Sequence, residues 1–289
     1  MTDAPEPAVA AALAGFAAGR AAVAAGIAVE PLAGGAANRS WHVRSTAGDW
    51  VVRLAGDADR TFAINRIAER QVHEAAARLG FAPAIVHALP EAGLLVTEYL
   101  DGHALSAAEV SAPDGLRALG ARLAELHAAP PPRGVRRLDV HEVLAHYMEL
   151  PGVPSGPVSR EDLGARLRWS LASYRQGAVA LCHNDLHHLN VIAAQRIWFV
   201  DWEYGGVGDP LFELAAVIGY HDLDPAQREL LLAAYGRPFA AERVVEMCLV
   251  FDCLHALWLD AARAWETVAP PRREALLARL RVDPAERET

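Results

Sequence analysis

Residues 181–204 read LCHNDLHHLNVIAAQRIWFVDWEY, and this stretch decides the expected fold. An apolar run leads into a polar loop that carries Asp185, and Asn190 is expected to open a short strand. After a turn near residues 194–196, a second short strand is expected to end on Asp201. Such a hairpin places two carboxylates and an amide oxygen at one end. Phosphoryl transfer from a magnesium nucleotide requires a carboxylate that accepts a hydroxyl proton and oxygen ligands for a hard cation.

Two motifs in this stretch carry a family resemblance. His183 to Asn190 has the form His-x-Asp-x-x-x-x-Asn, and Val-Asp-Trp-Glu-Tyr follows with Asp201 eleven residues after Asn190. Together they resemble the catalytic segment of the aminoglycoside phosphotransferase and choline kinase superfamily. The His-Asn-Asp and Asp-Trp-Glu-Tyr forms are most similar to choline, ethanolamine and thiamine kinase-like proteins. The resemblance implies an α+β, protein-kinase-like fold of two lobes, in which a helical second lobe carries the catalytic hairpin.

The resemblance also implies a chemistry for these side chains. ATP and Mg²⁺ are the expected cofactors, with Asp185 as the catalytic base for the acceptor hydroxyl. The expected metal ligands are Asn190, Asp201 and Glu203. A second interpretation is a transition-metal cluster of His183, His187 and His188 with Asp185, because imidazole is a common metal ligand. No Cys-x-x-Cys or His-Glu-x-x-His pattern supports it, and we expect His183 to brace the loop.

Composition and charge narrow the possible partners. The chain has 289 residues, with 27 Lys and Arg against 36 Asp and Glu, which gives a net charge of -9. A nucleic acid or an anionic membrane is therefore not expected as a partner, whereas a cationic substrate is favoured. Three cysteines form neither a disulfide framework nor a metal pattern, and the acidic, proline-broken N-terminus does not match a secretory signal. A cytoplasmic location is expected, and the oligomeric state stays open.

The first hundred residues alternate between strand and turn patterns. An Ala-rich helix is expected over residues 6–25, followed by strands at 27–32, 41–43, 50–54, 84–87 and 94–98 in one five-stranded antiparallel sheet. A further helix is expected over 61–79. The turn that carries Gly34, Gly35 and Asn38 resembles the superfamily's nucleotide-positioning loop, whose backbone N–H groups face phosphates.

A cationic residue on the third strand is expected to hold the nucleotide phosphates. Protein kinases use a lysine there, paired with a glutamate on the next helix. This chain has Arg53, which suits the choline-kinase-like branch and keeps a permanent charge. Its predicted partner is Glu69, because Arg66-x-x-Glu69 resembles the helix signature of that branch, and Glu74 is the alternative.

The segment Glu98 to Gly102 resembles the hinge between two lobes, where Glu98 and Leu100 are expected beside the adenine. The domains are accordingly predicted as residues 1–99, for nucleotide binding, and 100–289, for catalysis and substrate binding. Helices are expected in the second domain near residues 107–128, 140–150, 160–176, 211–220, 225–235, 240–265 and 271–281.

The acceptor is expected to be a small cationic alcohol, with choline or ethanolamine first and thiamine or an aminoglycoside as alternatives. Choline kinases that this chain resembles often carry two Trp three residues apart on a C-terminal helix, and this chain has His255 in place of the first, which leaves its specificity for a quaternary amine open. Tyr204, Trp258 and Asp209 are the predicted substrate contacts, and Trp265 is a further candidate for an aromatic cage. Carboxylates at Asp252 and Asp260 are expected to make that pocket more negative, and Glu213 to lie near the catalytic loop. For Asp209 and Glu213 the alternative is that their negative charge anchors the N-terminus of a helix. A hypothesis of another class, an inactive ATP-binding scaffold, predicts loss of the base or metal ligands. Those residues are present in the sequence.

Overall fold

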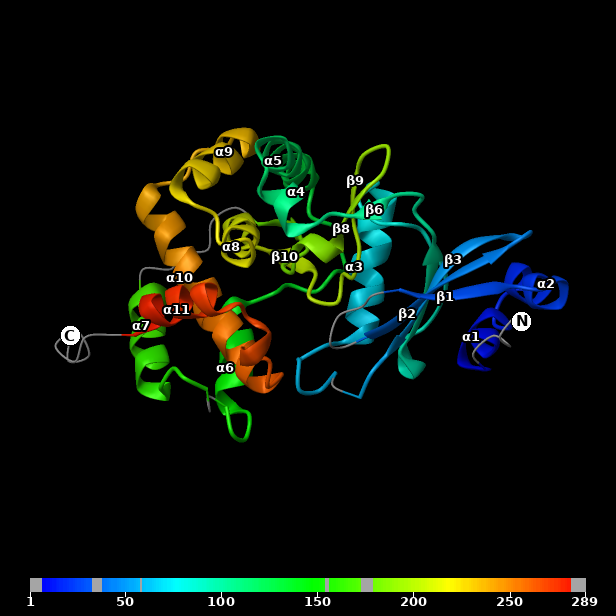
Figure 1. Cartoon of the computed structure of the whole chain (residues 1–289), viewed down its shortest axis with the longest axis horizontal. Helices are drawn as coiled ribbons and strands as arrows, with labels where there is room; N and C mark the ends of the chain where they lie inside the picture. The colour runs from blue at the N-terminus through cyan, green and yellow to red at the C-terminus, as the bar shows by residue number, and fades with distance from the viewer. Residues whose placement is uncertain (1–6, 33–37, 58, 154–155, 173–178, 282–289) are drawn as a thin grey trace.

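The computed structural model describes residues 7–32, 38–57, 59–153, 156–172 and 179–281. Its two ends differ in architecture, with a sheet at the N-terminal end and helices around the C-terminal end (Figure 1). No helix within these ranges is long and apolar enough to cross a membrane. The predicted fold class is confirmed, whereas the assignment of residues 1–99 and 100–289 to two functional domains stays a prediction.

Five antiparallel strands form the N-terminal sheet in the order β1-β2-β3-β5-β4. They are β1 (Ala28–Leu32), β2 (Asn38–Ser45), β3 (Gly48–Ala55), β4 (Ile85–Leu89) and β5 (Leu94–Glu98). Side chains alternate between the two faces of a strand. Trp50 and Val52 therefore pack into the core beneath the N-terminal helices, whereas Val51 and Arg53 face a cavity on the other side.

The opening helix is two helices, not the one that we predicted. They are α1 (Pro7–Leu13) and α2 (Ala17–Ala25), and both pack on the sheet. The break includes Gly15, where a Cβ atom would lie 2.3 Å from Nε2 of His87. Phe16 then has an extended backbone as the N-cap of α2. The close approach to His87 leaves no room for a side chain at residue 15, and glycine is unfavourable inside a helix, so this is a position where a helix is easily interrupted.

Helix α3 (Arg66–Arg78) begins five residues later than predicted. The Asn65 side chain accepts a hydrogen bond from the N–H of Ala68 and so caps the first turn. Gly80 follows the helix with φ +78, a conformation that glycine adopts without strain. The cap sets the start of α3 so that Arg66 and Glu69 fall in its first turn.

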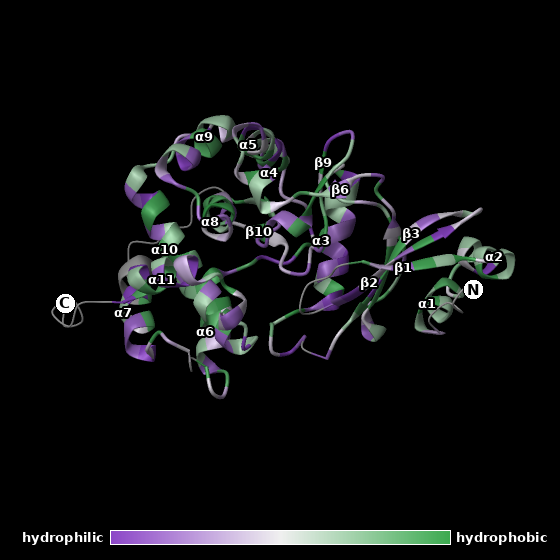
Figure 2. Cartoon of the chain, viewed as in Figure 1, coloured by the Kyte–Doolittle hydropathy of each residue, from purple (hydrophilic) through white to green (hydrophobic). Residues whose placement is uncertain are grey.

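The second lobe contains seven longer helices in the described ranges and two small sheets. Its helices are α4 (Ala107–Ser111), α5 (Pro113–Ala128), α6 (Val140–Glu149), α7 (Arg160–Ala172), α8 (Pro210–Tyr220), α9 (Pro225–Tyr235), α10 (Ala241–Ala261) and α11 (Pro270–Leu280), of which α4 is a short turn. We predicted a single helix over 107–128, but Ala112 has an extended backbone before Pro113, as is usual before proline. Helix α8 lies in the middle of this lobe and is buried from Pro210 to Ile218 (Figures 1 and 2).

The predicted hairpin is present with shifted ends. Its strands are β8 (Val191–Ala193) and β9 (Ile197–Phe199), and β8 also pairs with β6 (His103–Ala104). Asn190 ends a short 3₁₀ turn before β8, and Asp201 lies two residues beyond β9. The other small sheet pairs β7 (Ala180–Cys182) with β10 (Gly206–Gly208). These short strands bring residues 183–190 beside residues 200–205, where His183 bonds to Val200 and Asn184 to Tyr204.

Candidate active site

His183 braces the loop that carries Asp185. Its side chain is fully buried, and its Nε2–H donates to the carbonyl oxygen of Val200 over 2.8 Å. Nδ1 accepts from the N–H of Asp185 over 3.3 Å. Burial lowers the pKa of His183, so the ring is neutral, which matches one donor and one acceptor. The predicted bracing role of His183 is confirmed.

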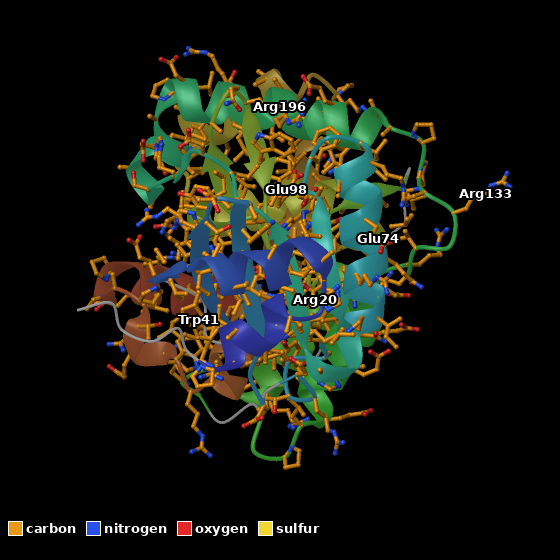
Figure 3. All side chains as sticks on the ribbon, turned by 90° about the vertical axis from the view of Figure 1, so that its right-hand side faces the viewer. Arg20, Trp41, Glu74, Glu98, Arg133 and Arg196 are labelled. Carbon is orange, nitrogen blue, oxygen red and sulfur yellow. The ribbon has the colours of Figure 1, made fainter. Side chains whose placement is uncertain are left out.

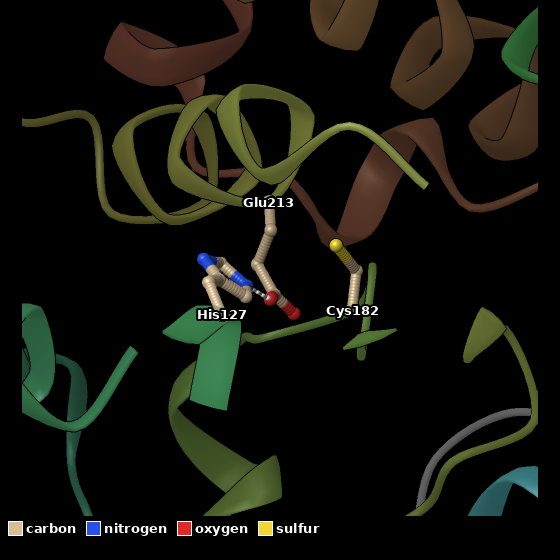
Figure 4. A group of neighbouring side chains, drawn as sticks. All are labelled: His127, Cys182 and Glu213. Atoms are coloured by element: carbon tan, nitrogen blue, oxygen red, sulfur yellow. Dashed lines mark hydrogen bonds and ion pairs between the residues drawn. The ribbon is translucent and has the colours of Figure 1, made fainter. Parts of the chain in front are cut away.

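A buried carboxylate anchors the same loop from α8. Oε1 of Glu213 accepts hydrogen bonds from the backbone N–H groups of His183 and Asn184, over 2.6 and 2.9 Å. Oε2 lies 2.5 Å from Nε2 of His127 on α5 (Figure 4). Cys182 lies beside this pair, close enough for the three side chains to share a metal ion. Because both oxygens of Glu213 already have partners, we interpret the group as a brace for the loop.

Asp185 is held by donors from two elements. The hydroxyl of Tyr220, in the last turn of α8, donates to Oδ1 over 2.6 Å. The amide group of Asn190 donates to the carbonyl oxygen of Asp185 over 2.8 Å and to Oδ2 over 3.3 Å. Burial raises the pKa of Asp185 to about 7, and the nearby charge of Asp201 adds to the increase. Its carboxylate thus titrates in the range where a general base is effective.

Asp201 and Glu203 accept hydrogen bonds from amide and guanidinium groups of the N-terminal lobe. Nδ2 of Asn38 donates to Glu203 over 2.8 Å and to Asp201 over 3.3 Å. Glu203 also accepts from Arg66 over 2.9 Å, and Asp201 accepts from Arg53. Burial and the neighbouring charge of Asp201 raise the pKa of Glu203. These contacts join α3 and the sheet to the segment after β9.

The structure pairs Arg53 with Glu69, at 2.5 Å, and not with Glu74. Glu74 forms its ion pair with Arg70 instead, on a more exposed face of α3 (Figure 3). Arg66 lies 2.9 Å from the other oxygen of Glu69. Arg53 and Glu69 are both buried, so the guanidinium group is fixed in place beside Asp201.

Three carboxylates lie close enough together to hold a cation. Oxygen atoms of Glu69, Asp201 and Glu203 lie within 4.8 Å of one another, and all three are hard ligands of the kind that Mg²⁺ prefers. The predicted ligand Asn190 also lies beside this group. Its carbonyl oxygen accepts a hydrogen bond from the backbone N–H of Val200, the residue before Asp201. The side chains present therefore fit Mg²⁺. Within the described ranges, the clusters of side chains that could hold a metal ion include neither His187 nor His188.

Two cavities meet at these residues, and both are lined by Asn38, His187 and Asp201. One, here called the acceptor cavity, has Asp185, Asp201 and Glu203 on one side. Its remaining wall is mainly aromatic, with Phe62, Tyr147, Tyr204, Tyr220, Phe251 and Trp258 next to His255. The other, here called the hinge cavity, is lined by β3 and β5 residues, by the segment from Glu98 to Leu100, and by Asn190.

Most of the predicted site residues thus line one of the two cavities. Asn38, Arg53, Glu98 and Leu100 line the hinge cavity, and Tyr204 and Trp258 line the acceptor cavity. Gly34 and Gly35 lie outside the described residues. Asp209 differs from the prediction, because its carboxylate caps α8 at the N–H of Leu211 and pairs with Arg243. It lines neither cavity, and we no longer regard it as a substrate contact.

The two carboxylates that we predicted beside Trp258 do not line the acceptor cavity either. Asp252 is paired with Arg279, with its oxygens 2.6 and 3.1 Å from the guanidinium group. Asp260 accepts from the indole N–H of Trp265. None of these side chains lines the acceptor cavity, whose negative charge comes from Asp185, Asp201 and Glu203 alone among the lining residues.

Sequence reasoning missed several lining residues from distant elements. Tyr147 comes from α6, Tyr220 from the end of α8, and Phe251 from α10. Each stands in a helical pattern in which an aromatic side chain is typical of the core, so no local signal distinguishes them. Only the packing of the three helices brings them to one cavity.

Comparison with known proteins agrees with this geometry. The model of the Phosphotransferase enzyme family matches residues 28–247. A curated relative, a LicA homolog from Metamycoplasma hominis, is 36% identical over 80 residues, which are 27% of this chain and 32% of that protein. The matched segment therefore spans about a third of the curated relative's length.

Solved structures resemble nearly the whole chain. A choline/ethanolamine kinase family protein from Mesorhizobium loti is 26% identical, with a TM-score of 0.71 over 97% of this chain and 94% of that one. The choline kinase LicA from Streptococcus pneumoniae also gives a TM-score of 0.71, at 22% identity over 87% and 92% of the chains. A structure of LicA in complex with AMP gives 0.70, at 22% identity over 88% and 92%.

Proposed function

The chain belongs to the Phosphotransferase enzyme family, and on this premise we propose that it transfers the γ-phosphoryl group of ATP to the hydroxyl group of choline or ethanolamine. One observation carries the proposal. The carboxylate of Asp185 faces an acidic, aromatic cavity that joins a second cavity beside the hinge at Asn38, His187 and Asp201. A phosphoryl donor in the second cavity and a cationic alcohol in the first would meet at Asp185.

The hinge cavity suits an adenine nucleotide. Apolar side chains of β3 and β5 form its floor, and the backbone from Glu98 to Leu100 forms its edge. Arg53, fixed by Glu69, lies in the same cavity and supplies positive charge for the phosphates. LicA, a protein of this fold, has been solved in complex with AMP, which supports an adenine nucleotide as the ligand of this chain.

Asp185 acts on the acceptor hydroxyl in this proposal. In its ionised form the carboxylate orients the hydroxyl group and takes its proton as the oxygen attacks the γ-phosphorus. Tyr220 and Asn190 hold the carboxylate in one orientation, so it does not have to reorganise during the reaction. Mg²⁺, held by Asn190, Asp201 and Glu203, would neutralise charge on the nucleotide phosphates.

The cation preference follows from the walls of the acceptor cavity. Aromatic faces such as those of Tyr204 and Trp258 attract an ammonium group by about 0.5–2 kcal/mol each. The carboxylates at one end strengthen that attraction, because they lie in a partly buried site where salt screens them less. A neutral alcohol of the same shape would gain neither contribution.

A coupled assay of ADP release tests the function. Purified protein with Mg-ATP is offered choline, ethanolamine, thiamine and a few aminoglycosides, and choline is compared with its neutral isostere 3,3-dimethylbutanol. We expect turnover of choline or ethanolamine and little turnover of the isostere. Activity only on thiamine or an aminoglycoside would move the acceptor to those alternatives. Nucleotide binding without turnover of any of these would favour an inactive scaffold.

A further inference from the structure

His255 adds a ring nitrogen to the mainly aromatic wall of the acceptor cavity. It lies on α10 and lines the cavity together with Phe251, Leu254 and Trp258 from the same helix. Its ring is 5.4 Å from that of Tyr220 and 5.6 Å from that of Phe251, between centroids. No described residue forms a hydrogen bond with either of its nitrogens.

The imidazole of His255 is neutral at physiological pH. Burial is the main cause of a lowered pKa, about 3, and the positive charges of Arg272 and Arg279 add to the effect. A neutral imidazole carries one lone pair that accepts a hydrogen bond, and it does not repel a cation. Leaving that acceptor without a partner after a substrate has displaced water from the cavity is unfavourable.

Tyr220 relates His255 to the catalytic carboxylate. The hydroxyl of Tyr220 contacts Oδ1 of Asp185, and its ring contacts that of His255. Asp185, Tyr220 and His255 line the same cavity, so there is room for an acceptor whose hydroxyl group lies at Asp185 to extend along Tyr220 toward His255. The nitrogen of a two-carbon amino alcohol is then the group that approaches the imidazole. The aromatic walls attract quaternary and protonated amines alike, so they do not distinguish between these cations.

We propose that His255 selects acceptors whose cationic nitrogen carries at least one N–H bond, over acceptors with a quaternary nitrogen. The proposal rests on the proposed function, and it makes the substrate class a protonated amino alcohol such as ethanolamine. An N–H group of the ammonium ion donates to the lone pair of His255. A trimethylammonium group presents only methyl groups there and leaves the nitrogen unpaired.

A methylation series tests this inference with the ADP-release assay. The acceptors are ethanolamine, its N-methyl and N,N-dimethyl derivatives, and choline, which differ in the number of N–H bonds. We expect kcat/KM of the wild-type protein to fall about tenfold or more at the last step, from N,N-dimethylethanolamine to choline, where the last N–H is lost. His255→Phe keeps a ring and removes the lone pair, so this ratio should fall to about one or reverse.

Two further variants separate the lone pair from a change in packing. His255→Gln keeps an acceptor oxygen, so it should retain part of the preference. His221→Phe alters a nearby half-buried histidine that does not line the acceptor cavity, and its ratio should match that of the wild-type protein.

The outcomes for the function and for the selectivity differ. If the wild-type protein turns over choline as well as N,N-dimethylethanolamine, or better, the role of His255 is overturned while the proposed function stands. This result needs no variant. A preference that survives in His255→Phe also overturns it. If none of the four alcohols is turned over, the proposed function itself fails.

Discussion

The hydroxyl of Tyr220 donates a hydrogen bond to Oδ1 of Asp185 over 2.6 Å, so the last turn of α8 contacts the catalytic loop directly. Asn190 donates to Oδ2 of the same carboxylate, over 3.3 Å. Both oxygens are thus oriented from different elements of the fold. The orientation of the proposed base therefore depends on Tyr220, which lies 35 residues after Asp185 in the sequence.

Asp185→Asn should remove most of the phosphoryl transfer, because the amide group cannot accept the hydroxyl proton. Loss of a positioned base lowers the rate about 10²- to 10⁴-fold. ATP affinity, measured by calorimetry, should change little, because Asp185 lines the acceptor cavity and not the hinge cavity. Asp114→Asn, at an exposed site on α5, is the matched control. Near-normal turnover by a folded Asp185→Asn protein would show that Asp185 is not the catalytic base.

Tyr220→Phe should lower kcat about tenfold while KM for ATP stays the same. The substitution removes one hydrogen bond to a charged group and keeps the ring in the cavity wall. Initial rates at varied ATP and varied acceptor separate the two parameters. An increase in KM for ATP with kcat unchanged would contradict the positioning role.

Transfer should depend on pH through Asp185. Burial raises its pKa to about 7, and only the deprotonated carboxylate is the base, so kcat/KM for the acceptor should fall about tenfold per pH unit below that value. The hydrogen bond from Tyr220 opposes the increase, so Tyr220→Phe should move the acid limb to higher pH. A profile that stays flat between pH 5.5 and 8 would argue against Asp185 as the base.

Asp201→Ala and Asn190→Ala should each weaken nucleotide binding only when Mg²⁺ is present. Each substitution removes a hard oxygen ligand from the proposed metal set. The measurement is ATP affinity with Mg²⁺ and with EDTA, for both variants and the wild-type protein. The hairpin would have another role if neither variant changed the dependence on the metal.

Glu213→Ala should destabilise the protein by about 3 kcal/mol or more. It leaves two buried backbone N–H groups, of His183 and Asn184, and the ring of His127 without their partner, and each unsatisfied group costs about 1–3 kcal/mol. Denaturant unfolding measures the change, with Glu229→Ala on the surface of α9 as the control. A difference below about 1 kcal/mol would contradict the bracing role of Glu213.

The sequence by itself determined the fold class and the catalytic hairpin. Alternation of apolar residues specifies strands, and the five strands form the predicted antiparallel sheet. The motifs from His183 to Tyr204 lie within one short hairpin, so local backbone geometry is enough to bring Asp185, Asn190 and Asp201 together. Arg53 and Glu69 could also be paired in advance, because Arg66-x-x-Glu69 resembles the helix signature of the choline-kinase-like branch.

Tertiary structure alone decided the walls of the acceptor cavity and the state of its charges. Gly15 against His87 and Pro113 after Ala112 ended helices that periodicity alone would have continued. A carboxylate such as Asp252 is indistinguishable from a site residue in the sequence, and it was assigned only by the arginine that it meets. Tyr220 and His255 lie on different helices, and their contact depends on how α8 packs against α10. A local pattern specifies which face of a helix is apolar, but not which residue of another helix that face will meet.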